Sequence, residues 1–305
     1  MERKSNFLKW GLLVLIAPWA LILLLSNVNR QNQHYADNRP VIDYWVDYKF
    51  DTFALPDTLP LGIRKFLAAY PGSFKGATYN ALIWPDDSLM EFDDGNIYKD
   101  YYKQLKEGDM EDMLKIPYTV GYMESPPVKN FNPGVIRYEP FFFKMYGGSK
   151  EAVVARLQEV QWVPGEPKKP SDPKKPFYLK ATGVNDVDGK LQAVTDSLMK
   201  LPHLHKYLVP PGGTFNWRNI ALTKSVSMHS FGIAIDICVK YSNYWRWDHP
   251  GVQPEQEKDI PMKNSIPQEI AHIFEHFGFI WGGKWYHYDT MHFEYRPELT
   301  VKIKE

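Results

Sequence analysis

Cysteine is nearly absent from this 305-residue sequence, which contains only Cys238. An intrachain disulfide is therefore impossible, although this leaves the redox compartment open. An excess of charge of either sign is also absent, because 36 Lys and Arg residues balance 36 Asp and Glu residues. This balance gives no indication of nucleic acid or another charged polymer as a partner. The chain has no internal repeat, and its length suits one large domain or two ordinary ones.

The N-terminus has an apolar run behind a basic flank. Arg3, Lys4 and Lys9 precede residues 10–29, which carry no charge. This order is typical of an export signal, and the positive-inside rule places the remaining chain outside the cytoplasm. The run is just long enough to span a bilayer, and no small-x-small cleavage site follows it. We therefore expect residues 1–30 to stay as a signal anchor in the inner membrane, with a cleaved signal peptide as the alternative.

The region after this segment changes in composition. Residues 31–65 are polar and interrupted by prolines, which predicts a linker. We expect the domain itself to cover residues 66–305, including an aromatic N-terminal extension. Within that extension, the acidic stretch 86–95 lacks the oxygen-ligand spacing of an EF-hand, which favours a solvated turn over a calcium loop.

Three stretches carry helical signals. Residues 149–162 are predicted to form a helix with Ser149 as its N-cap. Residues 187–201 place their apolar side chains on one helical face. Residues 265–279 form the clearest helix, with Ser265 as the predicted cap and a glycine near the end.

Two histidines on this last predicted helix require a decision. His272 and His276 are four residues apart, which is the spacing of a metal-binding pair. The zincin pattern requires Glu directly after the first histidine, but Ile273 stands there. Solvent-exposed histidines are therefore the favoured interpretation.

Residues 227–239 (SMHSFGIAIDICV) combine a strand pattern with potential ligands. From Gly232 onwards, apolar residues alternate, which predicts a half-buried strand. Asp236 lies on the side opposite the isoleucines, where an unpaired carboxylate is costly to bury. His229 precedes the strand, and the glycine lets the backbone turn so that this histidine can approach Asp236.

A second polar cluster near the C-terminus contains His287, Asp289 and His292. If a strand beginning at His292 lies beside the first strand, then His229, Asp236 and His292 come together. Two imidazoles and one carboxylate suit Zn²⁺, and catalytic zinc sites commonly leave a fourth position for water. Asp289 is close enough in sequence to take a proton from such a water as a general base.

The two clusters together resemble the signature of the M15 peptidases. The pattern is Ser-x-His-x-x-Gly-x-Ala-x-Asp at residues 227–236, followed by Asp-x-x-His-Phe-Glu at residues 289–294. Residues 131–147, 212–221 and 275–299 also resemble one branch of this family. Its members are D-Ala-D-Ala carboxypeptidases, D-Ala-D-Ala dipeptidases and L-alanyl-D-glutamate endopeptidases of bacterial cell walls and phage lysins. The resemblance implies an α+β fold of the Hedgehog/DD-peptidase type, with helices flanking a small antiparallel sheet that carries one zinc ion.

The resemblance also implies roles for individual residues. The implied zinc ligands are two histidines and one aspartate: His229, Asp236 and His292. Asp289 matches the general base. Arg218 matches the residue that holds the substrate and stabilises the oxyanion, since a guanidinium stays charged and its donor fork fits carboxylates and oxyanions. Ser227 matches a position that contacts the substrate carboxylate.

Other residues near the motifs have alternative interpretations. His287 either lines the cleft or orients the general base, but an ordinary strand histidine is favoured. Cys238 is interpreted as a small buried thiol. Three aromatic residues around the glycine pair form either a mobile wall for a peptide stem or part of the core, and both interpretations stay open: Trp281, Trp285 and Tyr286.

We therefore expect an exported zinc metallopeptidase that hydrolyses stem peptides of peptidoglycan, with the D-Ala-D-Ala carboxypeptidase type favoured. An L-alanyl-D-glutamate or cross-link endopeptidase is the alternative specificity. A non-catalytic zinc-containing module that binds the cell wall is the alternative of another class. The presence of both Asp289 and Arg218 argues against that module. The expected partners are stem peptides and, through the N-terminal segment, the inner membrane, with no nucleic acid.

Overall fold

The computed structural model describes residues 58–165, 173, 175–254 and 259–303. The predicted anchor at residues 1–30 and most of the predicted linker lie outside these residues. In the described part of the chain, no helix combines the length and the apolar character needed to cross a membrane. All described residues belong to one unit of the chain.

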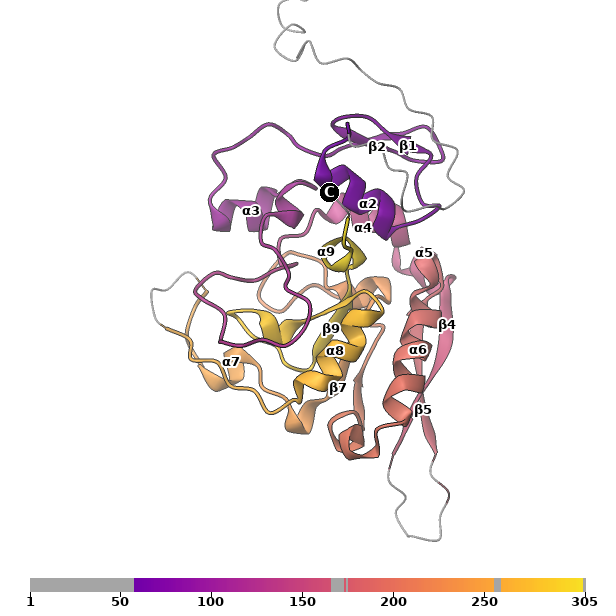
Figure 1. The fold of residues 1–305 in the computed structure, drawn as a ribbon, viewed down its shortest axis with the longest axis vertical. Coiled ribbons are helices and arrows are strands. Elements are labelled where there is room, and N and C mark those ends of the chain that lie inside the picture. Colours follow the sequence, from indigo (N-terminus) through magenta and orange to yellow (C-terminus); the bar gives the residue numbers. More distant parts are fainter. Residues whose placement is uncertain (1–57, 166–172, 174, 255–258, 304–305) are drawn as a thin grey trace, which may run out of the picture. The chain divides into compact units, whose positions relative to one another are not determined.

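Short helices and small antiparallel sheets make up the described chain (Figure 1). The α-helices are α2 (Leu61–Ala69), α3 (Tyr101–Glu107), α4 (Glu139–Tyr146), α5 (Lys150–Val154), α6 (Val187–Met199), α7 (Trp245–Asp248), α8 (Gln268–His276) and α9 (Pro297–Thr300). The 3-10 helices are η2 (Asp112–Leu114), η3 (Val184–Asp186), η4 (Pro202–Tyr207), η5 (Met228–Phe231), η6 (Val239–Tyr241) and η7 (Gly282–Lys284). The strands are β1 (Gly76–Ala77), β2 (Ala81–Ile83), β3 (Leu89–Glu91), β4 (Leu157–Pro164), β5 (Pro176–Thr182), β6 (Pro211–Gly213), β7 (Ala234–Cys238), β8 (Phe279–Trp281) and β9 (His292–Tyr295). This mixture of elements is compatible with the predicted α+β class.

The strands form three sheets, with the orders β1-β2-β3, β4-β5 and β6-β7-β9-β8. All pairs in the third sheet are antiparallel. In this sheet Asp236 lies opposite His292, and Ile235 lies opposite Phe293. Residues directly opposite each other share a face of the sheet. The polar pair Asp236 and His292 therefore lies on one face, and the apolar pair Ile235 and Phe293 lies on the other.

The apolar face of the third sheet packs into the core. The ring of Phe293 stacks on Phe274 of α8 with 3.9 Å between the ring centroids, and Ile235 and Phe274 are fully buried. Helix α6 packs on the β4–β5 hairpin, as Figure 1 shows. Because α8 covers the side of Ile235 and Phe293, the polar pair of β7 and β9 is left on the other face.

Several predicted elements are confirmed. The alternation that predicts a strand from Gly232 is observed in β7, with Ile235 and Ile237 fully buried. Helix α6 buries the apolar face that its sequence predicts. Helix α8 has the predicted core but begins at Gln268, with Pro267 rather than Ser265 at the N-cap position.

The prediction of a single helix over residues 149–162 is wrong. Ser149 does cap a helix, since its Oγ accepts a hydrogen bond from Ala152 N at 3.2 Å. That helix is only α5, and the chain continues as β4, where Val160 and Trp162 alternate as buried residues. Pairing with β5 therefore overrides the helical propensity of this segment.

The predicted boundary between linker and domain at residue 66 falls inside α2. This helix begins at Leu61 and buries Ile63, Phe66 and Leu67. Its apolar face contacts the core, and the helix also packs against α9. The last residues of the predicted linker are thus part of the folded unit.

Candidate metal centre

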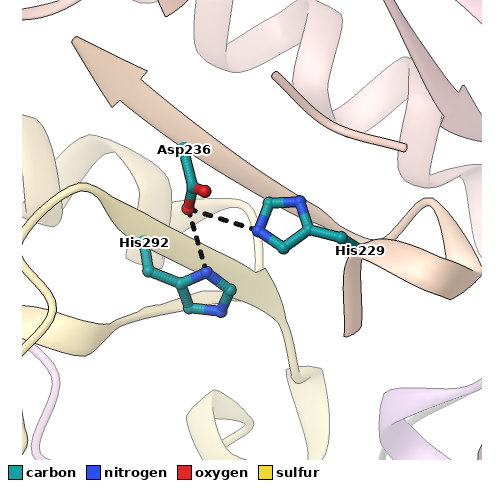
Figure 2. Close-up of side chains that lie close together, drawn as sticks. All are labelled: His229, Asp236 and His292. Carbon is teal, nitrogen blue, oxygen red and sulfur yellow. Dashed lines mark hydrogen bonds and ion pairs between the residues drawn. The ribbon is translucent and has the colours of Figure 1, made fainter. Parts of the chain in front are cut away.

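Three predicted ligand residues converge on the polar face of the third sheet (Figure 2). His229 belongs to η5, Asp236 lies in the middle of β7, and His292 begins β9. Asp236 Oδ1 is 3.2 Å from His229 Nε2 and 3.1 Å from His292 Nδ1. The antiparallel register explains one of these contacts, because Asp236 and His292 are directly opposite each other.

Gly232 brings His229 to this face. It ends η5 in the left-handed conformation, with a φ of 68°, which a glycine adopts without steric cost. A Cβ at this position would lie 2.7 Å from Leu157 Cδ2 and 3.1 Å from Thr182 N. The predicted turn between the histidine and the strand is therefore present, and the backbone packs too closely for a side chain.

A backbone carbonyl fixes the orientation of His229. Its Nδ1 is 2.5 Å from Thr214 O. A carbonyl oxygen can only accept, so Nδ1 carries the hydrogen and the neutral ring has its lone pair on Nε2. That Nε2 is buried, makes no hydrogen bond among the described residues, and faces Asp236.

A carboxylate fixes the orientation of His292 in the same way. Its Nε2 is 2.9 Å from Glu294 Oε2, so Nε2 donates and the lone pair of the neutral ring faces Asp236. Burial favours the neutral ring, but hydrogen bonds to Asp236 and Glu294 outweigh it and raise the pKa of His292 to about 10. Nδ1 therefore also carries a proton near neutral pH, and a metal ion would have to displace this proton to bind there. Burial likewise opposes the charge on Asp236, yet both histidines hold its pKa well below the usual range.

The donor set fits a zinc ion. One ligand atom from each of the three residues lies within 4.8 Å of the others. Two ring lone pairs that face one carboxylate repel it unless a cation lies between them. Imidazole nitrogens and a carboxylate oxygen are common ligands of zinc. The described residues could therefore hold a metal ion at this point.

Asp289 lies beside this centre on the segment before β9. Its N donates to Gly282 O at 3.0 Å, and its own O accepts from His292 N at 3.2 Å. The side-chain Oδ1 is buried and has no hydrogen-bond partner within the described ranges. Burial raises the pKa of Asp289 to about 7, although the nearby His292 charge opposes this shift. A carboxyl group with such a pKa can exchange a proton near neutral pH.

Arg218 and Ser227 meet at the base of a hairpin. Ser227 N donates to Arg218 O at 3.0 Å, and the pair Asn219 and Val226 continues the ladder. The Arg218 side chain is exposed, whereas Ser227 is buried directly before η5. The charge of Arg218 also lowers the pKa of Asp289. The fold therefore places this guanidinium within electrostatic reach of the predicted base.

The alternatives around the centre now have structural answers. Trp281, Trp285 and Tyr286 are buried, which supports the core interpretation. The Trp285 ring lies 5.6 Å from the His292 ring and so forms part of the wall behind it. His287 Nδ1 faces Asn132 Nδ2 at 3.1 Å. The structure thus gives this histidine a packing contact with the preceding part of the chain.

The remaining groups of interest are a cysteine, two histidines of α8 and an acidic cluster. Cys238 is a buried free thiol. His272 and His276 are exposed, as expected. The acidic groups near residues 93–112 surround Lys99, whose Nζ lies 2.7–3.0 Å from three carboxylates: Asp94, Asp109 and Asp112. An ammonium group therefore already occupies the centre of this acidic cluster.

Sequence reasoning missed the role of the residues that support the two histidines, although the motif at residues 289–294 includes Glu294. Glu294 is two positions after His292 and therefore on the same face of β9, which is a signal that could have identified it. Arg137, which contacts Glu294, is 157 residues away from it in the chain. Thr214 contacts His229 through its backbone, and a backbone contact leaves no signature in residue type.

Comparison with protein families agrees with this geometry. Residues 221–295 match a peptidase M15 family described as D-alanyl-D-alanine carboxypeptidase. The matched segment contains the three candidate ligands and Asp289, but not Arg218. No curated protein and no solved structure shows a significant match to the chain. The segment that carries the candidate ligands thus matches the peptidase M15 family.

Proposed function

We propose that this protein is a zinc peptidase that hydrolyses stem peptides of peptidoglycan, acting as a D-Ala-D-Ala carboxypeptidase. The observation that carries the proposal is the convergence of His229, Asp236 and His292 beside a buried Asp289 oxygen that has no hydrogen-bond partner in the described part of the chain. The family description supports the carboxypeptidase type. A purely structural zinc site has no use for a carboxyl group with a pKa near neutrality.

The chain's own residues divide the chemistry between them. Zinc, when bound to His229, Asp236 and His292, supplies a Lewis acid and lowers the pKa of water. Asp289 accepts a proton from the attacking water and passes it to the amine that leaves. Arg218 provides a permanent positive charge for the developing oxyanion or for the substrate carboxylate.

Fold, location and partners follow as part of the same proposal. We assign the described part of the chain to the Hedgehog/DD-peptidase fold, supported by the motif resemblance and by the antiparallel sheet that carries two of the ligands. The basic flank and the uncharged run at residues 10–29 support export and an anchor in the inner membrane. The partner would then be peptidoglycan on the outer side of that membrane.

The test uses residues 31–305 and defined muropeptides. The protein is incubated as purified, after chelation, and after zinc is added back, and the products are identified by mass spectrometry. Chelator-sensitive release of one D-Ala is the expected result. Cleavage within the stem or at a cross-link would show that the protein is an endopeptidase instead of a carboxypeptidase. If the protein holds zinc but yields no product, the proposal of an enzyme would be overturned and the non-catalytic binding module would be favoured.

A further inference from the structure

We infer that Glu294 and Arg137 are positioning residues of the metal centre, which hold His292 with its Nδ1 lone pair directed at Asp236. The inference rests on the metal centre of the proposed function, but not on the peptidase reaction or its substrate. Neither residue is among the predicted ligands or catalytic groups. Arg137 also lies outside the segment that matches the peptidase family.

The first observation is the contact between two residues of one strand. His292 and Glu294 stand two positions apart on β9, so their side chains share a face. Glu294 Oε2 is 2.9 Å from His292 Nε2, and Glu294 is completely buried. A carboxylate that accepts a hydrogen bond from the non-ligating nitrogen of a histidine fixes both the hydrogen position and the ring orientation.

The second observation is that Glu294 itself has little freedom. Arg137 Nη2 donates to its Oε2 at 2.6 Å, and Arg296 Nη1 donates to its Oε1 at 3.1 Å. Arg296 is held in turn by Gly134 O at 2.6 Å and by Glu298. Both oxygens of Glu294 are therefore engaged by guanidinium groups, which leaves the carboxylate one orientation beside His292.

The third observation is the balance of buried charge. Two carboxylates, Glu294 and Glu298, face two guanidinium groups, Arg137 and Arg296. This set is neutral by itself, so it stays compensated when His292 contributes an uncharged ring. A neutral ring is the form that binds a metal ion.

A purely structural role is the competing explanation, because removing one member of a buried ion network is destabilising in any case. Glu298 provides a matched control. It is as buried as Glu294 and pairs with Arg296, and its Oε2 accepts from Tyr70 OH at 2.6 Å. Its carboxylate is thus engaged by Arg296 and Tyr70 rather than by His292.

The experiment compares Glu294→Gln, Arg137→Gln and Glu298→Gln in the full-length chain, purified in mild detergent. Zinc affinity is measured by competition with a chromophoric chelator, Co²⁺ absorption spectra report ligand geometry, and thermal unfolding is recorded without metal. An amide cannot replace Glu294, because both of its oxygens accept hydrogen bonds and one end of an amide only donates. We expect Glu294→Gln and Arg137→Gln to weaken zinc binding about 10–100-fold and to alter the Co²⁺ bands.

Glu298→Gln is expected to lower the melting temperature but to leave zinc affinity and the Co²⁺ spectrum as in the wild type. Unchanged zinc affinity in both Glu294→Gln and Arg137→Gln would overturn the inference. An equal loss of zinc affinity in Glu298→Gln would show that the ion network is only structural, and it would also overturn the inference.

If Glu294→Gln does not fold, the zinc affinity of Arg137→Gln tests the inference, and Arg137→Lys should recover part of that affinity. A wild-type protein that binds zinc but cleaves no muropeptide would remove the peptidase proposal and leave this inference standing, whereas one that binds no zinc would overturn both.

Discussion

At the scale of single residues, the candidate centre depends on two hydrogen atoms. Thr214 O fixes one on His229 Nδ1, and Glu294 fixes the other on His292 Nε2. In the neutral form that binds a metal ion, each ring presents its remaining nitrogen to Asp236, so the two histidines would act through different ring atoms. Asp289 stands apart from this set, because its side-chain Oδ1 has no hydrogen-bond partner within the described residues.

Because Asp289 is separate from the candidate ligands, its substitution Asp289→Asn should affect catalysis and not metal binding. The amide cannot accept a proton at neutral pH, so we expect hydrolysis of muropeptides to fall about 10²–10⁴-fold. Zinc affinity should stay within twofold of the wild type, because Asp289 is not in the ligand set. Initial rates and chelator competition on the same preparation measure both quantities. Wild-type rates in the variant would show that another group moves the proton.

At the scale of elements, the loop between β8 and β9 places Asp289. Gly282 in η7 accepts a hydrogen bond from Asp289 N. A Cβ on Gly282 would lie 2.5 Å from Asp289 O and 3.0 Å from the Trp285 ring. The loop therefore has no room for a side chain at this glycine.

We predict that Gly282→Ala displaces Asp289 and lowers the hydrolysis rate roughly 10²-fold, as expected for a misplacement of about 1 Å. Two of the three candidate ligands, on β7 and η5, are untouched, so zinc affinity should fall less than the hydrolysis rate. Gly148→Ala is the matched control, since a Cβ there would meet no atom within 4 Å. Equal rates in the two alanine variants would contradict the close packing around residue 282.

The sequence predicted the elements that depend on neighbouring residues and missed those that depend on contacts between distant parts of the chain. The alternation in β7 and the turn at Gly232 are local, so both were predicted correctly. Residues 149–162 were not, because Ser149 gives a genuine cap signal and only pairing with β5 makes the later part a strand. The ligand set came from motif spacing, whereas Arg137 was missed because its contact with Glu294 exists only in the folded chain.

At the scale of the whole molecule, the part of the chain before the family match supports the centre. Trp285 Nε1 donates to Pro133 O at 2.7 Å, and Tyr286 N donates to Phe131 O at 2.9 Å. Asn132 Oδ1 accepts from His287 N at 2.9 Å. Residues 131–133, which precede the family match, are thus built into the wall of the centre.

We therefore predict that residues 221–295 do not fold alone. This fragment lacks β6, the β4–β5 hairpin and the segment around Pro133, so it would expose apolar surface and unpaired polar groups. Circular dichroism should show no cooperative thermal transition, and zinc should bind more weakly than to residues 31–305. A cooperative transition in the fragment would instead identify an independent domain.

A second prediction for the whole molecule concerns acid stability. Burial works against the charge on Asp112, but hydrogen bonds from Lys115 and Lys99 lower its pKa. A carboxyl group with a lowered pKa stabilises the fold above its unfolded pKa of about 3.9 and loses this contribution as the pH falls further. We expect Asp112→Asn to reduce the free energy of unfolding by about 1–3 kcal/mol at pH 7.

Urea unfolding followed by tryptophan fluorescence measures this difference, which should shrink between pH 4 and the acid range as Asp112 itself becomes protonated. Glu107→Gln serves as the control, because Glu107 is exposed and pairs only loosely with Lys103 at 3.8 Å. A loss of stability that is the same at acid and neutral pH would assign the effect to packing rather than charge.

The direct opposition of Asp236 and His292 across β7 and β9 also bears on how the protein reaches its fold. A slip of one residue between these strands would turn one of the two side chains to the opposite face, so a misaligned sheet would have no pair of ligands to offer. Metal capture would then report correct strand alignment during refolding. Zinc supplied to a folding chain would be taken up only by molecules whose sheet has closed in the native register, and binding would selectively retain those molecules.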